Sequence, residues 1–258
     1  MARRIDFINP FGTDLYDAII QETLQPYAAQ GTDLRVSHLE GCPENIDYYY
    51  YKHLMENVVY ERVLEAEAEG FDAVVVGCCY DPGVLVAREL VDIPVVGPLE
   101  AAVHLAPYYG HTFSVVTDHH KAVPFIRDMI RLYGVEPNCR SVGCIGWWVT
   151  EMVKSPDKVA ADAVAVSRQA LERDGSEVVI LACTIIGACL EREILRTGAY
   201  RDIPVLNPNI AALKMAETLA DLRSRGKYVP SRVAFYEKPQ DHDRAEFDSV
   251  RRRFAWRG

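Results

Sequence analysis

The chain has 258 residues, 49% of them hydrophobic, and its 28 Lys and Arg against 37 Asp and Glu give a formal net charge of -9. This charge disfavours nucleic acid and anionic membranes as partners, and the length accommodates one large domain or two small ones. Seven cysteines, an odd number, fit a reducing compartment better than a disulfide framework. The first residues lack the apolar core of a signal peptide, and no apolar run approaches about 18 residues. We therefore expect a soluble, cytoplasmic protein.

Short β-branched runs alternate with longer segments of helical period, which is typical of a parallel sheet covered by helices. In chain order, the sequence predicts strands near 4–9, 33–38, 72–78, 94–96, 112–117, 139–145, 177–183 and 203–206. It predicts helices at 14–29, 48–69, 84–91, 99–108, 121–133, 157–174, 187–197 and 209–224. This count fits either a (β/α)₈ barrel or two doubly wound domains.

An internal repeat separates these two architectures. Residues 72–79 (DAVVVGCC) align with 177–184 (EVVILACT), and the DIPV of 92–95 recurs at 202–205 in the same order. We therefore predict an α/β protein with two pseudo-symmetric, doubly wound parallel-sheet domains and an active site in the cleft between them. The predicted halves are 1–105 and 106–225, with helices near the boundaries able to cross between them. Residues 226–258 form a C-terminal extension that belongs to neither repeat.

The repeat places Cys78 and Cys183 at equivalent strand ends, where they would face each other across the cleft. Opposed thiols suit a two-base proton transfer, in which one thiolate removes a proton from a carbon and the other thiol delivers one to the opposite face. A helix follows each cysteine, and its N-terminal dipole would lower the thiol pKa enough to populate the thiolate. Successive strand residues point to opposite faces, so Cys79 is expected behind the cleft surface.

Several segments resemble the hydantoin racemase family of the Asp/Glu racemase superfamily. They are 77–83 (GCCYDPG), 93–97 (IPVVG), 179–183 (VILAC), 203–205 (IPV), 9–10 (NP) and 113–117 (FSVVT), and the resemblance covers about 4–222 in order. It implies a cofactor-independent racemase of 5-substituted hydantoins or allantoin, with Cys78 and Cys183 as the acid–base pair. It also implies that Asn9 and Thr117 hold the ring carbonyls, together with backbone N–H groups after the cysteines. Relatives form homo-oligomers, commonly tetramers or hexamers.

The departures from the family pattern lie around the expected pocket. Phe11 and Tyr80 replace smaller residues, Asp118 and His119 follow the Thr-bearing strand, and Ile185 stands where Gly is usual. We therefore predict that the two-cysteine proton transfer is kept. The altered pocket residues favour a bulkier or less charged substrate. The full predicted substrate-binding set is Asn9, Phe11, Cys79, Tyr80, Thr117, Asp118, His119, Thr184 and Ile185.

Other readings of these residues stay open. The histidine pair at 119–120 has three possible roles: metal ligands, pocket-lining residues of which one polarises a cysteine, or the cap of a surface helix. Because neighbouring residues rarely converge on one ion, no metal is predicted. Trp147 and Trp148 either close the cleft over a ring or pack between domains or subunits. The tyrosines at 48–51 are candidates for an oligomer interface.

Three functional alternatives remain beside the racemase. A maleate isomerase-like enzyme also uses two cysteines, whereas an arylmalonate decarboxylase-like enzyme keeps only one, so the presence of both Cys78 and Cys183 disfavours the decarboxylase. The third alternative, from a different class, is a protein that binds a small molecule in the cleft without turnover.

Overall fold

The computed structural model of the protein describes residues 3–44, 47–226 and 228–254. The described residues form two four-stranded sheets in which every strand pair is parallel. The strand orders are β2-β1-β3-β4 and β6-β5-β7-β8, so the second sheet repeats the topology of the first. This confirms the predicted fold class of two pseudo-symmetric α/β units and excludes the single barrel.

All eight predicted strands are present, with slightly different ends. They are β1 (Arg3–Ile8), β2 (Thr32–Ser37), β3 (Ala73–Val76), β4 (Val95–Val96), β5 (Phe113–Thr117), β6 (Cys139–Cys144), β7 (Val178–Leu181) and β8 (Val205–Leu206). The central strands β3, β5 and β7 are buried along their whole length. Because both faces of such a strand are covered, its sequence is a continuous apolar run rather than an alternating one.

The eight predicted helices are also present, together with two that were not predicted. The helices are α1 (Asp17–Leu24), α2 (Tyr49–Ala68), α3 (Val84–Leu90), α4 (Pro98–Leu105), α5 (Ala122–Leu132), α6 (Val149–Met152), α7 (Pro156–Arg173), α8 (Thr184–Thr197), α9 (Pro208–Ser224) and α10 (Arg244–Phe254). Short 3₁₀ helices occupy Gln25–Tyr27, Ala106–Tyr108, Glu136–Asn138, Ala234–Tyr236 and Asp241–Asp243. The unpredicted helices are α6 and α10.

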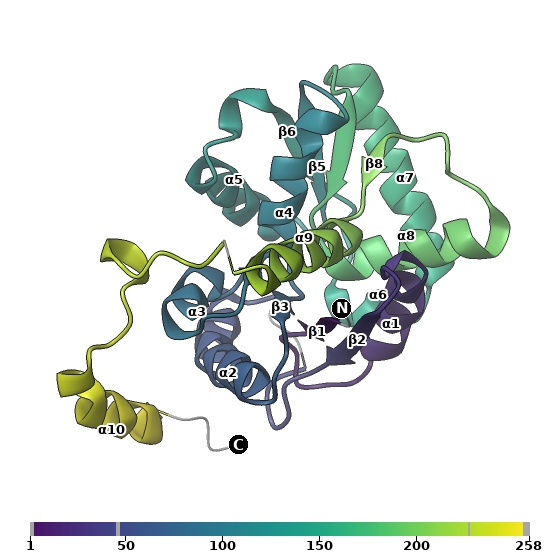
Figure 1. Cartoon of the computed structure of the whole chain (residues 1–258). Helices are drawn as coiled ribbons and strands as arrows, with labels where there is room; N and C mark the ends of the chain where they lie inside the picture. The colour runs from purple at the N-terminus through teal and green to yellow at the C-terminus, as the bar shows by residue number, and fades with distance from the viewer. Residues whose placement is uncertain (1–2, 45–46, 227, 255–258) are drawn as a thin grey trace.

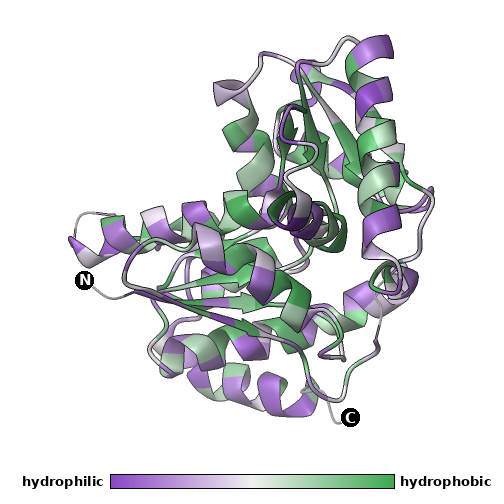
Figure 2. Cartoon of the chain, turned by 90° about the vertical axis from the view of Figure 1, so that its right-hand side faces the viewer, coloured by the Kyte–Doolittle hydropathy of each residue, from purple (hydrophilic) through white to green (hydrophobic). Residues whose placement is uncertain are grey.

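Hydrophobic side chains of the strands and of the helix sides that face them form the core. Figure 2 shows green strands between helices that are green toward the sheet and purple toward solvent. The largest fully buried side chains include Phe7, Tyr16, Met55, Ile126 and Ile180, which come from both halves of the chain. Burial of this kind is the main favourable contribution to folding.

Helix α9 ties the two halves together. It follows β8 of the second sheet but packs against β1 and β3 of the first sheet and against α4 (Figure 1). A salt bridge between Arg3 of β1 and Asp221 of α9, with a shortest distance of 2.5 Å from Nε to Oδ1, fixes this crossing. Helices α1 and α8 pack against each other across the same junction. The domain boundaries at 105 and 225 stay a prediction, because these helices pack across them.

Residues 228–254 contact the first half of the chain. The Arg232 guanidinium donates to the Arg88 carbonyl at 3.0 Å and pairs with Asp92. Farther along, Arg251 of α10 pairs with Glu61 of α2, its Nε donating to Oε1 at 2.9 Å. Figure 1 shows α10 in yellow beside α2. Within the described part of the chain, every helix is too short or too polar to cross a membrane.

Candidate active site

Cys78 and Cys183 follow equivalent strand positions in the two sheets. Val76, the last residue of β3, pairs with Ile8, and Leu181, the last residue of β7, pairs with Val116. One residue beyond each pair the backbone makes the same hydrogen bond: Gly77 N–H donates to Ile8 O at 2.7 Å, and Ala182 N–H donates to Val116 O at 2.7 Å. Each cysteine is the next residue.

The backbone turns sharply after each strand, so that N–H groups approach the sulfur atoms. Cys78 N–H donates to Val76 O at 2.7 Å, and the Tyr80 N–H donates to Cys78 Sγ at 3.5 Å. Cys183 is the residue before α8, whose first-turn backbone N–H groups at Ile185 and Ile186 act on its thiol. Both thiols therefore face N–H donors two residues later in the chain, as expected for pseudo-symmetric positions.

Burial nevertheless keeps both cysteines protonated. Loss of solvent raises the pKa of Cys78 to about 12, although the Tyr80 N–H opposes this. Burial and then the Asp118 carboxylate raise the pKa of Cys183 well above its usual value, against the N–H groups of α8. The sequence-based prediction that helix N-termini populate the thiolates is therefore wrong. The N–H groups act in that direction, but desolvation of the buried sulfur is the larger effect.

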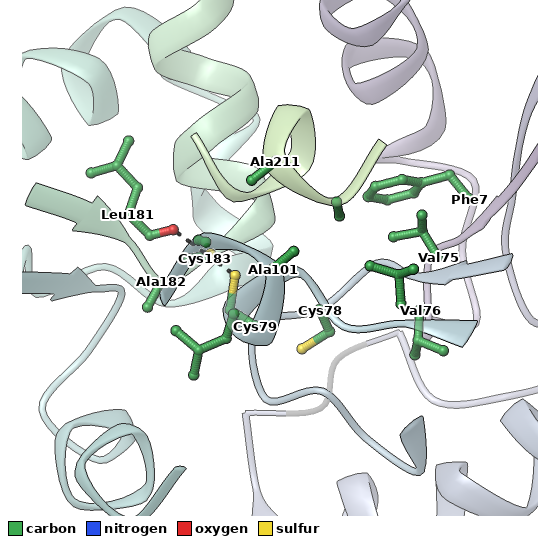
Figure 3. Close-up of a cluster of buried hydrophobic side chains, with 14 of the residues drawn as sticks. Phe7, Val75, Val76, Cys78, Cys79, Ala101, Leu181, Ala182, Cys183 and Ala211 are labelled. Carbon is green, nitrogen blue, oxygen red and sulfur yellow. Dashed lines mark hydrogen bonds between the residues drawn. The ribbon is translucent and has the colours of Figure 1, made fainter. Parts of the chain in front are cut away.

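Both cysteines line one small, partly open cavity at the junction of the two sheets. Its volume is about 20 Å³, enough for about one water molecule. Figure 3 shows Cys78, Cys79 and Cys183 gathered at this junction. The lining residues are Phe11, Asp47, Cys78, Cys79, Tyr80, Asp118, Val149, Ala182, Cys183 and Thr184.

Cys79 is a buried core residue that also lines the cavity, which is compatible with its inclusion in the predicted binding set; the expectation that strand alternation would turn it away from the cleft was wrong. The strand ends at Val76, and the strict alternation of side chains ends with it. Beyond that point the turn brings Cys78 and Cys79 to the same cavity. The Cys79 thiol lies 3.9 Å from the carbonyl oxygen of Leu181, the contact drawn as a dashed line in Figure 3.

Four of the predicted site residues are buried around the cavity without lining it: Asn9, Thr117, His119 and Ile185. Asn9 Nδ2 donates to Asp17 at 2.6 Å, and its Oδ1 has no hydrogen-bond partner among the described residues. Thr117 Oγ1 donates to Ala182 O at 3.1 Å, which links the end of β5 to the loop of Cys183. The roles predicted for these four side chains stay predictions.

Sequence reasoning missed Asp47, which lines the cavity from the loop before α2. Asp47 and Asp118 are both buried and flank His119, whose Nε2 lies 3.5 Å from Asp47 Oδ1 and 3.8 Å from Asp118 Oδ1. Burial raises the pKa of Asp118 to about 6, with the Asp47 charge acting in the same direction and His119 in the opposite one. Desolvation disfavours the charged His119, but Asp47 and Asp118 outweigh it and raise the His119 pKa.

Aromatic side chains cover this acidic cluster from outside. The Trp148 ring lies 4.3 Å from the His119 ring and 5.9 Å from the Tyr48 ring, measured between centroids. Trp148 therefore packs between the two halves rather than lying inside the cavity. His119 is buried, which excludes a surface helix cap for it, whereas His120 is exposed.

The same cluster is the place where the described residues could hold a metal ion. Ligand atoms of Asp47, Asp118 and His119 all lie within 4.8 Å of one another. Two carboxylates and an imidazole suit a divalent cation such as Mn²⁺ or Zn²⁺. The sequence-based expectation of no metal stays a prediction.

Comparisons with known proteins agree on one family. A family model described as Asp/Glu/Hydantoin racemase matches residues 5–216. A hydantoin racemase of Rhizobium meliloti is 30% identical over 236 residues, which cover 92% of this chain and 95% of the relative. Among solved structures, an allantoin racemase from Klebsiella pneumoniae superposes with a TM-score of 0.83 at 25% identity, covering 93% of this chain and 95% of that one. An allantoin racemase from Pseudomonas fluorescens superposes with a TM-score of 0.80 at 30% identity, covering 92% of this chain and 97% of that one.

Proposed function

The chain belongs to the Asp/Glu/hydantoin racemase family and is a racemase, and from this premise we propose that it interconverts the enantiomers of a 5-substituted hydantoin or allantoin-like cyclic ureide. The proposed acid–base groups are the thiols of Cys78 and Cys183, with no cofactor. One observation carries the proposal: these two cysteines follow equivalent strands of the two sheets and line a single cavity.

In the proposed reaction, the thiolate of one cysteine removes the proton from C5, so a C–H bond breaks and an S–H bond forms. The electron pair moves into the adjacent ring carbonyl and gives an enolate. The thiol of the second cysteine then protonates C5 on the opposite face, which inverts the centre and leaves the protonation states of the two sulfurs exchanged. Backbone N–H groups near Tyr80 and Ile185 would stabilise the sulfur anions and the enolate oxygen.

A ureide ring needs more space than a cavity of about 20 Å³ provides. The site must therefore open for the substrate to enter. Val149 lines the cavity at the start of α6, and Trp148 covers the cluster beside it. We place the opening movement in this segment and at Asp47 and Tyr48, because Tyr48 stacks on Trp148.

Charge distinguishes the ureide from the carboxylate substrates of the alternative reactions. Asp47 and Asp118 line the cavity, and no Lys or Arg is among its described lining residues. Maleate, arylmalonates and acidic amino acids all carry carboxylates, which two buried carboxylates would repel. Hydantoin and allantoin rings are uncharged at neutral pH and offer N–H donors. The charge of the cavity therefore favours the racemase of a cyclic ureide over the isomerase and the decarboxylase.

The test is incubation of single enantiomers of 5-substituted hydantoins and of allantoin with the protein in D₂O. Circular dichroism follows racemisation, and mass spectrometry follows deuterium at C5. We expect loss of optical activity together with one deuterium per inversion. No racemisation across aliphatic, aromatic and ureido substituents, combined with turnover of maleate or an arylmalonate, would overturn the proposal.

We further propose that the active form is a homo-oligomer, a tetramer or a hexamer, as the family resemblance implies. Tyr48 and Tyr50 are strongly exposed near the N-terminus of α2, where aromatic side chains suit a subunit interface. Sedimentation equilibrium of the full chain tests this, and a monomer at micromolar concentration would contradict it.

A further inference from the structure

The carboxyl groups on the acidic side of the cavity neither give nor take a proton in the proposed transfer. Asp47 and Asp118 come from different halves of the chain, are 3% and 4% exposed, and line the cavity that holds the two cysteines. His119 stands between them at ion-pair distance. Burying two carboxylates costs free energy, so their presence in a racemase cavity calls for a partner.

The described surroundings supply little positive charge to these carboxylates. Lys52, whose charge acts on Cys78, is paired with Glu56, 2.8 Å from Nζ to Oε1. Lys121, whose charge acts on His119, has its Nζ 4.0 Å from the centroid of the Tyr49 ring. His119 is thus the basic side chain that lies between the two acids. A group that brings N–H donors or positive charge would be attracted to this side of the cavity.

The Tyr80 hydroxyl is an independent sign that a polar ligand binds here. Tyr80 is 5% exposed and lines the cavity, and its hydroxyl has no hydrogen-bond partner among the described residues. Its pKa is raised by burial first and then by the charge of Asp118, so the hydroxyl stays protonated and available to donate. A buried hydroxyl without a partner costs free energy unless a ligand satisfies it.

Together these side chains match a carbamoyl group. Two carboxylates accept N–H bonds, and the Tyr80 hydroxyl donates to a carbonyl oxygen. In the proposed reaction C5 lies between the two cysteines, and we assign the substituent on C5, rather than the ring, to Asp47 and Asp118, which line the same cavity.

We propose that Asp47 and Asp118 are specificity-determining residues that select a C5 substituent ending in N–H donors, such as a carbamoyl or ureido group, and reject one ending in a carboxylate. The inference rests on the proposed racemisation of hydantoins. A site built for N–H donors rejects an analogue that lacks them by large factors, so we expect at least about a hundredfold preference in kcat/KM.

The test compares two hydantoins of nearly the same shape, 5-(2-carbamoylethyl)hydantoin and 5-(2-carboxyethyl)hydantoin, with 5-isobutylhydantoin as an uncharged reference. For the wild-type protein, the carbamoyl substrate should exceed the carboxylate substrate at least about a hundredfold in kcat/KM. Asp47→Asn and Asp118→Asn should each lower this ratio at least about tenfold, mainly by improving the carboxylate substrate. Asp128→Asn is the matched control, because it removes one negative charge from an exposed position on α5 and should leave the ratio unchanged.

Several results would overturn the inference while leaving the proposed function intact. With 5-isobutylhydantoin turned over normally, equal rates for the carbamoyl and carboxylate substrates would do so. The inference would also be overturned if neither Asn variant changed the ratio of kcat/KM for the carbamoyl and carboxylate substrates. Asp47 and Asp118 would then contact the hydantoin ring, or no part of the substrate. Preference for the carboxylate substrate that disappears with a chelator would assign Asp47 and Asp118 to a metal ion instead. Failure to turn over any hydantoin, the isobutyl reference included, would overturn the proposed function itself.

Discussion

Cys78 and Cys183 occupy the same place in two copies of one supersecondary unit, each two residues beyond a buried strand and each facing the N–H of the second residue after it. This equivalence distinguishes them from Cys79, which shares the cavity but is paired by the repeat with Thr184. The Cys79 thiol is instead directed to the Leu181 carbonyl.

Replacing either equivalent cysteine should abolish racemisation. General acid–base groups typically contribute about 10² to 10⁴ in rate, so Cys78→Ser and Cys183→Ser should each lower kcat/KM at least about a hundredfold. Cys79→Ser is the matched control from the same loop and should retain activity within about tenfold. Circular dichroism and thermal unfolding verify that all three variants fold. Full activity in Cys78→Ser with loss in Cys79→Ser would show that the wrong cysteine of the pair has been assigned.

The raised cysteine pKa values predict a steep pH dependence. Because the pKa of Cys78 lies near 12, the thiolate is a small fraction at neutral pH and grows about tenfold per pH unit. We expect kcat/KM for 5-isobutylhydantoin to rise with pH across the neutral and weakly alkaline range. The Asp118 charge raises the pKa of both Cys78 and Cys183, so Asp118→Asn should move the profile to lower pH. A profile that is flat between about pH 6 and 9, with thiolate absorbance already at its maximum, would contradict this.

Asp81 should make the free energy of unfolding depend on pH. Burial raises its pKa to about 7, against the hydrogen bonds from Tyr133, at 2.6 Å, and from the backbone N–H groups of Leu99 and Glu100. A carboxyl with a raised folded-state pKa stabilises the fold below its unfolded-state value, and this contribution is lost as pH rises toward 7. The difference in unfolding free energy, wild type minus Asp81→Asn, should therefore fall by on the order of 1 kcal/mol per pH unit between about pH 4 and 7.

Urea titrations at several pH values measure that difference. The comparison cancels the contributions of all other titrating groups, which are common to both proteins. Above about pH 8 the difference should become constant, because Asp81 is then ionised in both states. If the difference in unfolding free energy between the wild type and Asp81→Asn were the same at every pH, Asp81 would not hold a proton in the folded protein.

Gly77 positions the loop of Cys78 through its lack of a side chain. A Cβ at this position would lie 2.2 Å from Cε1 of the buried Phe7 ring, whereas one at Gly143 of β6 would have its nearest neighbour at 3.7 Å. Gly77→Ala should therefore destabilise the protein by about 1–3 kcal/mol and lower activity by displacing Cys78. Gly143→Ala is the control and should be close to neutral. Equal thermal stability and activity of the two variants would contradict this account.

The repeat in the sequence predicted the two sheets and the equivalence of Cys78 and Cys183, because both follow from local apolar runs and their spacing. The sequence did not predict the features that depend on contacts between distant segments or on the exact end of a strand. The sequence predicts a helix that begins at 187, but α8 begins at Thr184, because Cys183 is the last extended residue before it. Asp47 could not be assigned because its contact with the loop of Asp118 joins two distant segments.

The proton-transfer claim is tested most directly by the isotopic content of both enantiomers early in the reaction in D₂O. If Cys78 and Cys183 act as two separate bases, the product enantiomer of 5-isobutylhydantoin should carry deuterium at C5 while the unreacted enantiomer keeps its protium. Cys78→Ser and Cys183→Ser should then each exchange at most one enantiomer, and a different one in each variant. Deuterium entering both enantiomers at equal rates from the start, or full racemisation by either variant, would contradict the two-cysteine account.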